Sequence, residues 1–260
     1  MALLQCHFYS EVLGLNTTMT VILPQATRTQ IGLENRAGGG KHPTLYLLHG
    51  LSDDDSIWLR RTSIERYAAP YGLAVVMPQV HRSFYTDMKF GERYWTFLSD
   101  ELPALARSFF PLSDRREDNF VAGLSMGGYG AFKWALRRPE HFAAAASLSG
   151  ALDMASHVRK PKIEWETDLF GFIYGKEDIA GTENDLLWLL EQGEASDKPK
   201  PKLYQCCGTE DFLHEDNVAF TETCRKTSYD LTAVYDKGDH EWGYWDDHIQ
   251  RVLEWLPLRR

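Results

Sequence analysis

The alternation of short apolar runs with helix-like segments constrains the fold of this chain more than any other feature. Residues 44–50 (TLYLLHG) form a continuous apolar run, which is typical of a strand buried on both faces of a sheet. Similar runs recur at 73–78, 119–124, 143–150, 202–208 and 231–236, and two earlier strands are predicted at 3–10 and 18–23. Because helical patterns separate most of these strands, the sequence predicts an α/β fold with a mostly parallel, eight-stranded sheet flanked by helices. In such sheets, ligands bind at the carboxyl ends of the strands.

The helical patterns cover 56–67, 94–110 and 127–138, and a last helix is predicted after the final strand. Residues 153–200 interrupt the alternation, because they carry aromatic and charged side chains without a clear strand. We expect a helical insertion over the strand ends, a cap or lid; ordinary helix packing is the alternative that the sequence leaves open. Since 260 residues suffice for one large α/β domain, residues 1–260 are predicted to form a single domain with this insertion.

Composition limits the classes of partner. The formal net charge is −9, and no cluster of lysine or arginine rises above this acidic background, which argues against binding to nucleic acid or to an anionic membrane surface. The first fifteen residues lack the features of a signal peptide, and no apolar run approaches the ~20 residues needed to cross a bilayer. We therefore expect a cytoplasmic protein with reduced cysteines and a small-molecule partner. Cys206 and Cys207 point to opposite faces of a predicted strand, and no metal site is predicted.

A serine lies between two glycines where a predicted strand meets a predicted helix. This is Ser125, in the stretch Gly-Leu-Ser-Met-Gly of residues 123–127. A turn this tight forces strained backbone angles on the serine, requires small residues two positions before and after it, and lifts the hydroxyl above the sheet edge. The helix that follows would stabilise developing negative charge at its positive end. Ser125 is therefore the predicted nucleophile, with a plain glycine turn as the alternative.

A serine hydroxyl is a weak nucleophile until a base accepts its proton, and in this architecture the chain order is serine, acid, histidine. His240 follows the last strand, where Gly238 permits a turn, and is the predicted base. Asp211 follows the penultimate strand and is the predicted acid, with a helix N-cap as its alternative role and Asp153 as the runner-up. Weaker candidates for the acid are Glu210, Asp216 and Asp239. The other downstream histidines are set aside as bases: His141 and His157 come too early in the chain, His214 is expected in a loop and His248 in the C-terminal helix.

An oxyanion hole needs two backbone N–H groups aimed at the tetrahedral intermediate. The sequence predicts that Met126, directly after the serine, supplies one and that Leu51, in the loop after residues 44–50, supplies the other. His49 is expected to hold this loop through a ring hydrogen bond rather than to act in catalysis. Trp58 and Trp95 are candidates to line a substrate pocket, with plain core packing as the equal alternative.

Five stretches in this order carry a resemblance to a known family: LLHGLSDDDSIW, AGLSMGGYGA, SGALD, GTEDFLHEDN and DHEWGYWDDHI. They resemble the esterase branch of the α/β-hydrolases, which holds esterase D (S-formylglutathione hydrolase), feruloyl esterases and mycolyltransferases. The chain is most similar to bacterial tributyrin esterases, nearly end to end. The resemblance implies Ser125 as nucleophile, Asp211 as acid, His240 as base, and Leu51 and Met126 as oxyanion donors. It also implies an α/β-hydrolase fold without a cofactor, in a family whose members often form dimers or larger assemblies.

These observations predict a serine carboxylesterase that hydrolyses short-chain acyl esters through an acyl-enzyme. Tributyrin, p-nitrophenyl acetate and p-nitrophenyl butyrate are the expected substrates, and acetylated sugars are further candidates. A thioesterase of the S-formylglutathione hydrolase type is the first alternative because it uses the same three side chains. An acyltransferase and a non-catalytic binding protein on a hydrolase scaffold are weaker alternatives.

Overall fold

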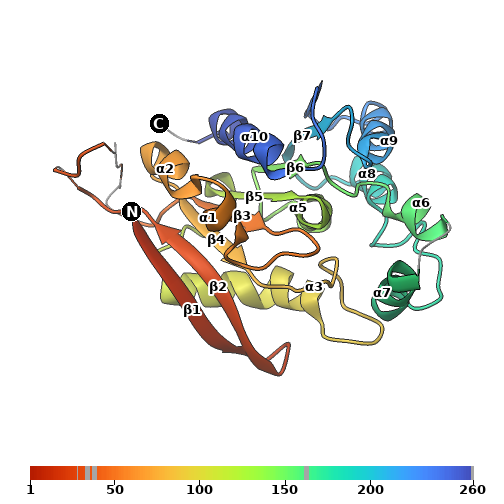
Figure 1. Cartoon of the computed structure of the whole chain (residues 1–260), viewed down its shortest axis with the longest axis horizontal. Coiled ribbons are helices and arrows are strands. Elements are labelled where there is room, and N and C mark those ends of the chain that lie inside the picture. Colours follow the sequence, from red (N-terminus) through yellow and green to blue (C-terminus); the bar gives the residue numbers. More distant parts are fainter. Residues whose placement is uncertain (28, 33–35, 37–39, 161–163, 259–260) are drawn as a thin grey trace.

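A mixed sheet forms the centre of the computed structural model, which describes residues 1–27, 29–32, 36, 40–160 and 164–258 (Figure 1). Its strands are β1 (Ala2–Ser10), β2 (Leu15–Leu23), β3 (Thr44–Leu48), β4 (Ala74–Pro78), β5 (Asn119–Leu124), β6 (Ala144–Leu148), β7 (Lys202–Gly208) and β8 (Leu231–Asp236). They lie in the order β1-β2-β4-β3-β5-β6-β7-β8. β1 and β2 are antiparallel to their neighbours, and all pairs from β4 to β8 are parallel. The predicted eight-stranded, mostly parallel sheet is confirmed.

Helices cover both faces of this sheet, which is why every residue of β3, β4, β5 and β6 is buried. On one face lie α1 (Ile57–Arg61), α2 (Ile64–Ala68) and α10 (Trp242–Trp255). On the other lie α3 (Tyr94–Thr96), α4 (Leu102–Phe109), α5 (Met126–Arg137), α8 (Leu186–Glu194) and α9 (His214–Cys224). Each face therefore has its own hydrophobic core.

Two local predictions need correction. The single helix predicted at 56–67 is two short helices, because Thr62 between them is extended (φ −134°, ψ 174°). Its hydroxyl donates to the Trp58 carbonyl at 2.6 Å and accepts from the Ile64 N–H at 3.1 Å, which ends one helix and starts the next.

The second correction concerns His214, which is the first residue of α9 and not part of a loop. The sequence of α9 lacks a clear apolar stripe, so periodicity could not reveal it.

The segment 153–200 is helical where the structure describes it, and residues 161–163 lie outside the described residues. It contains α6 (Met154–Arg159), α7 (Glu164–Tyr174) and α8, and the described part holds no strand between β6 and β7. α6 and α7 lie on the side of the molecule opposite β1 (Figure 1). The carbonyls of Phe172 and Ile173, at the end of α7, accept from the N–H groups of Phe90 and Lys89 at 3.0 and 2.8 Å. The end of α7 is thus joined to the loop that follows β4.

A buried lysine on α5 joins the same region to the core. The side chain of Lys133 is fully buried, and its Nζ donates to the Tyr85 carbonyl, the Thr86 hydroxyl and the Asn184 side-chain oxygen at 3.0, 2.7 and 2.7 Å. Burial lowers the pKa of this ammonium well below 10.5. Its three N–H donors nevertheless match three acceptors, so α5, the loop after β4 and the approach to α8 are held together at one point.

Candidate active site

Ser125 occupies a strained turn between β5 and α5. Its φ is 53° and its ψ −119°, a conformation that non-glycine residues rarely adopt and that persists only when the surroundings enforce it. The flanking glycines are required by close packing: a Cβ at Gly123 would lie 2.3 Å from the Gly127 carbonyl oxygen, and one at Gly127 would lie 2.5 Å from the Leu48 carbonyl oxygen. The turn therefore places the serine at the carboxyl edge of the sheet, directly before a helix.

Asp211 and His240 reach this serine from the two strands at the end of the sheet. β7 and β8 are parallel, with Gly208 opposite Asp236, so the loops that follow them leave the same edge. These loops touch, since a Cβ at Gly208 would lie 2.2 Å from the Gly238 carbonyl oxygen. His240 Nε2 lies 3.0 Å from Ser125 Oγ, and His240 Nδ1 lies 2.9 Å from Asp211 Oδ2 and 3.1 Å from Asp211 Oδ1. The three side chains thus form a continuous hydrogen-bonded line.

The environment of Asp211 keeps its carboxyl group ionised. Burial alone would raise its pKa, yet hydrogen bonds from His240, from the Leu213 N–H at 2.8 Å and from Ser149 outweigh this effect, so the pKa lies below 3.8. A carboxylate at this position accepts the Nδ1–H of His240 and leaves the Nε2 lone pair free to accept the proton of Ser125. Asp211 is not the N-cap of α9, the alternative role predicted for it, because that position is taken by Leu213; its Oδ1 instead accepts from the Leu213 N–H in the turn before the helix.

Aromatic rings hold the imidazole from two sides. The ring of Phe212, 71% exposed, lies with its centroid 4.5 Å from that of His240. The ring of Trp245 meets the imidazole edge-to-face at 4.9 Å, and its Nε1 donates to the Ser149 hydroxyl at 3.1 Å. Sequence reasoning missed Ser149 and Trp245. Their positions in the sequence could have indicated them, since Ser149 lies near the end of the apolar run 143–150 and Trp245 comes five residues after His240.

Ser149 supports Asp211 because its hydroxyl, which accepts a hydrogen bond from Trp245 Nε1 at 3.1 Å, helps to lower the pKa of the carboxyl group. Replacing Ser149 with alanine should lower kcat about tenfold, the usual effect of losing one hydrogen bond to a charged group, and leave KM unchanged. Steady-state kinetics with p-nitrophenyl acetate measure both constants. Ser147→Ala is the matched control, because Ser147 is equally buried on β6 and its hydroxyl has no partner among the described residues. Equal losses in the two variants would contradict this role.

The backbone at the end of β3 lies against the start of α5, since a Cβ at Gly127 would lie 2.5 Å from the Leu48 carbonyl oxygen and 2.7 Å from that of His49. Met126 is the first residue of α5, so its N–H has no acceptor within the helix. Leu51 follows Gly50, where a Cβ would lie 2.8 Å from the Leu124 side chain. His49 is buried: its Nδ1 donates to the Gly50 carbonyl at 2.7 Å, and its Nε2 accepts from the Val80 N–H at 3.2 Å. Burial lowers the pKa of His49 to about 4, and the neutral ring holds the loop as expected.

The other candidates have different positions. Asp153, the runner-up acid, caps α6 by accepting from the Ser156 N–H at 3.1 Å. Asp239 accepts from the backbone N–H of His240 at 2.7 Å, and so fixes the loop rather than the ring. Trp58 and Trp95 are only 1% and 5% exposed, and both belong to the hydrophobic cores. The prediction left a pocket wall and core packing equally open for both side chains, and their burial favours core packing. None of the described contacts with Ser125 or His240 involves the remaining candidates, which are Glu210, His141, His157, His214, His248 and Asp216.

A pocket opens beside Leu51, between the loops after β3 and β4 and the helix α7. Its apolar wall consists of Leu51, Met88, Tyr94, Leu169 and Phe172. Two of these side chains come from α7, so the inserted segment helps to shape the space next to the predicted oxyanion hole.

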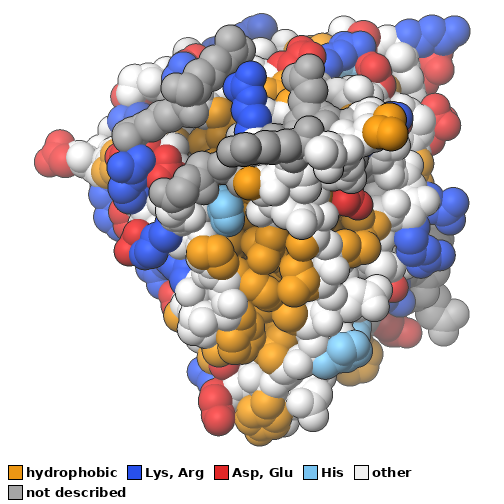
Figure 2. Space-filling model, turned by 90° about the vertical axis from the view of Figure 1, so that its left-hand side faces the viewer, with side chains coloured by type: hydrophobic (Ala, Val, Ile, Leu, Met, Phe, Trp, Pro, Cys, Tyr) orange, Lys and Arg blue, Asp and Glu red, His pale blue; other side chains and the backbone are white. Residues whose placement is uncertain are grey.

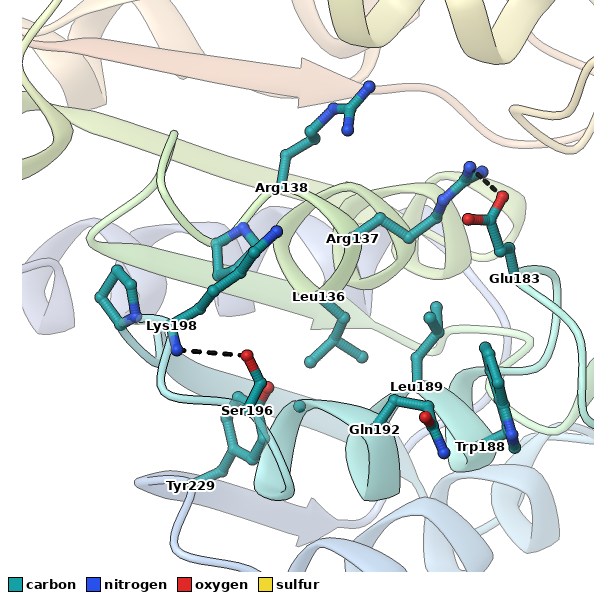
Figure 3. A pocket seen from close by; sticks show the side chains of 13 residues that line it. Leu136, Arg137, Arg138, Glu183, Trp188, Leu189, Gln192, Ser196, Lys198 and Tyr229 are labelled. Atoms are coloured by element: carbon teal, nitrogen blue, oxygen red, sulfur yellow. Dashed lines mark hydrogen bonds and ion pairs between the residues drawn. The ribbon is translucent and has the colours of Figure 1, made fainter.

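A second pocket lies between the end of α5 and α8 (Figure 3). It starts at Leu136, eleven residues along the helix from Ser125, which corresponds to roughly 16 Å. The cations that line it are already paired within the protein: Arg137 with Glu183, Arg138 with Asp100 at 3.2 Å, and Lys198 with Glu140 at 3.9 Å. This pocket is therefore separate from the Ser125 site.

Across the described residues, no group of three or more His, Cys, Asp or Glu side chains is arranged to hold a metal ion. The helices that the structure describes also include none with the length and apolar character of a membrane span.

Comparison with known proteins identifies a family and several similar structures. The family model described as "Putative esterase" matches residues 10–256. An acetyl esterase of Caldicellulosiruptor saccharolyticus is 31% identical over 263 residues, covering 98% of each protein. The solved structure of FphF, a fluorophosphonate-binding serine hydrolase of Staphylococcus aureus, is similar with a TM-score of 0.87, 36% identity and 98% coverage of both chains. The S-formylglutathione hydrolase FrmB of Staphylococcus aureus gives a TM-score of 0.84, 36% identity and 98% coverage of both chains.

Proposed function

The chain belongs to the esterase family of α/β-hydrolases and is a serine carboxylesterase. On that premise, we propose that Ser125, Asp211 and His240 hydrolyse short-chain acyl esters through an acyl-enzyme. The observation that carries the proposal is the unbroken line from Asp211 Oδ2 through the imidazole to Ser125 Oγ, with contacts of 2.9 and 3.0 Å. These separations suit proton transfer without a rearrangement of the site.

In the proposed mechanism, His240 Nε2 takes the proton of Ser125 as the serine oxygen attacks the ester carbonyl. The N–H groups of Leu51 and Met126 stabilise the negative charge that develops on the carbonyl oxygen. The imidazolium then gives its proton to the leaving alcohol, and the acyl group remains on Ser125. Water, deprotonated by His240, attacks this acyl-enzyme, and the imidazolium then returns the proton to Ser125 Oγ as the acid is released. Asp211 stays ionised throughout and stabilises the imidazolium in each half-reaction.

Kinetics on a series of p-nitrophenyl esters test this proposal. The chain should hydrolyse p-nitrophenyl acetate and butyrate, and also tributyrin, with higher kcat/KM than S-formylglutathione. The acetyl esterase among its relatives supports acetyl esters, acetylated sugars included, as the first class to examine. Failure to hydrolyse any of these esters would contradict the proposal.

A thioesterase activity is the second candidate, and the similarity to FrmB favours it. The same acyl-enzyme would form, with a thiolate rather than an alkoxide as the leaving group. A kcat/KM for S-formylglutathione at least tenfold above that for p-nitrophenyl acetate would favour this activity over the first.

We also propose that residues 153–200 form a cap on the single domain and that Leu169 and Phe172 of α7 limit the length of the acyl chain. Both side chains line the pocket beside Leu51. Replacing either with alanine should raise the ratio of kcat/KM for the hexanoate ester to kcat/KM for the acetate ester by about 10-fold. This is roughly the effect of making room for one further methylene group in an apolar pocket. The matched control is Phe90→Ala: Phe90 is 64% exposed and joined to Phe172 through the backbone, but does not line this pocket. An unchanged ratio in Leu169→Ala and Phe172→Ala would exclude this pocket as the acyl site.

A cytoplasmic location remains part of the proposal. All four cysteines are free, and three of them are buried, which suits a reducing compartment. Fractionation of cells that produce the full chain would test this location.

A further inference from the structure

Three consecutive carbonyls at the end of β3 each accept a hydrogen bond from a buried ring. Trp58 Nε1 donates to the Leu48 carbonyl at 3.0 Å. The Tyr85 hydroxyl donates to the His49 carbonyl at 2.8 Å, and His49 Nδ1 donates to the Gly50 carbonyl at 2.7 Å. The three rings are at most 1% exposed, so water does not compete for these carbonyls. The peptides that carry them are therefore held in one orientation.

These bonds fix the direction of the Leu51 N–H, the predicted oxyanion donor. The Gly50 carbonyl and the Leu51 N–H belong to the same planar trans peptide, in which the two groups point in opposite directions. The preceding peptide, between His49 and Gly50, shares the Gly50 Cα with it. Glycine allows wide rotation about that Cα, so a tilt of the preceding peptide would turn the N–H as well. The Tyr85 hydroxyl prevents this tilt through its bond to the His49 carbonyl.

Tyr85 reaches this peptide from a strained stretch of the loop after β4. Phe84 and Tyr85 have φ angles of 49° and 52°, in the left-handed region that non-glycine residues rarely adopt. Neighbouring groups hold Tyr85 there: Lys133 Nζ donates to its carbonyl at 3.0 Å, and its N–H donates to the Ser83 hydroxyl at 3.2 Å. The ring lies against α5 at Gly130, where a Cβ would come within 2.4 Å of it. Strain of this kind is concentrated at functional sites, and here it directs a hydroxyl to the predicted oxyanion hole.

We propose that Tyr85 is a positioning residue for the oxyanion hole, because its hydroxyl fixes the peptide after His49 and so aims the Leu51 N–H at the ester carbonyl oxygen. This role rests on the proposed function, in which Leu51 is one of the two oxyanion donors. Among the described residues, no other donor bonds to the His49 carbonyl, which lacks a partner once the hydroxyl is removed. The described lining of the pocket beside Leu51 does not include Tyr85, so the hydroxyl acts through the backbone and not on the substrate.

Steady-state kinetics on two substrates test this role in the variant Tyr85→Phe. The substrates are p-nitrophenyl acetate and its thionoester, in which sulfur replaces the carbonyl oxygen. Sulfur is a weak hydrogen-bond acceptor, so the ratio of kcat/KM for the oxygen ester to kcat/KM for the thionoester reports the oxyanion hole. We expect Tyr85→Phe to lower kcat for p-nitrophenyl acetate about 10-fold at an unchanged KM, and to lower this ratio about 10-fold. Ser149→Ala acts on Asp211, so it should lower kcat for both esters and leave the ratio unchanged.

A second variant tests the same ring by a different change. Phenylalanine keeps the ring beside Gly130, so Tyr85→Phe should melt only a few degrees below the wild type. Gly130→Ala displaces this ring while its hydroxyl remains, and should also lower the ratio. The test then does not depend on the stability of one variant.

Two other tyrosines serve as matched controls. Tyr46 on β3 is 1% exposed, and its hydroxyl has no partner among the described residues, so Tyr46→Phe should keep the wild-type kcat and ratio. Tyr9 on β1 is 53% exposed, on the side of the molecule where hydrophobic side chains gather in a patch (Figure 2), and Tyr9→Phe should likewise have no effect.

The outcomes separate this role from the proposed function. A wild-type ratio in Tyr85→Phe or in Gly130→Ala would overturn the role of Tyr85 and leave the esterase activity in place. An equal loss in Tyr46→Phe would overturn it as well. A wild type that hydrolyses neither ester would overturn the proposed function together with this role.

Discussion

Replacing Ser125 with alanine should lower kcat for p-nitrophenyl acetate by about 10⁵- to 10⁶-fold, because the acyl-enzyme can no longer form. What remains is the slow attack of water helped by substrate binding and by the N–H groups of Leu51 and Met126, which the substitution leaves in place. The melting temperature should stay close to that of the wild type. Alanine keeps the Cβ that Ser125 already carries at φ 53°, so the strain of the turn is unchanged.

A fluorophosphonate probe distinguishes the loss of the nucleophile from the loss of the fold. The wild type should be labelled on Ser125, and Ser125→Ala should not be labelled at all. Ser113→Ala is a suitable control because Ser113 is also buried, but its hydroxyl bonds to Asp118 at 2.7 Å, far along the sheet from the site. Equal labelling of the wild type and Ser125→Ala would refute the assignment of the nucleophile.

The residues of the site could be predicted because each has a local signal in the sequence. Ser125 lies in a glycine-flanked strand-to-helix turn, and Asp211 and His240 each follow an apolar run. Parallel strands bring such positions to one edge of a sheet, so the chain order serine, acid, histidine was enough to predict the three residues. The structure then supplies what the order could not, namely the distances between the three side chains.

Other features could not be predicted because they depend on packing between distant segments. The side chain of Trp58 is held in the core, where its Nε1 donates to the Leu48 carbonyl at 3.0 Å. No pattern in the sequence predicts this contact. The link from Trp245 through Ser149 to Asp211 joins three elements that are far apart in the chain. The break at Thr62 arises from one side chain that bonds to the backbone on both sides, which outweighs the helical periodicity around it.

Replacing Asp211 with asparagine should lower kcat by about 10⁴-fold while the fold is retained. The carboxylate accepts from His240 Nδ1 and, through the other oxygen, from the Leu213 N–H. An asparagine can keep the bond to Leu213 through its side-chain oxygen, but it then presents its NH₂ group to the imidazole. The ring would turn to the tautomer with the proton on Nε2, and this nitrogen could no longer accept the proton of Ser125.

The matched control for this substitution is Asp153→Asn, which changes the alternative acid in the same way. Asp153 caps α6, and asparagine is an equally good N-cap, so kcat and the melting temperature should both stay near the wild-type values. Because the pKa of Asp211 lies below 3.8, its carboxylate is ionised at every pH at which an esterase assay is practicable. The loss in Asp211→Asn should therefore be the same at pH 6 and at pH 9. A large loss in Asp153→Asn together with a small one in Asp211→Asn would reverse the assignment of the acid, because the orienting carboxylate would then have to approach His240 from the end of β6.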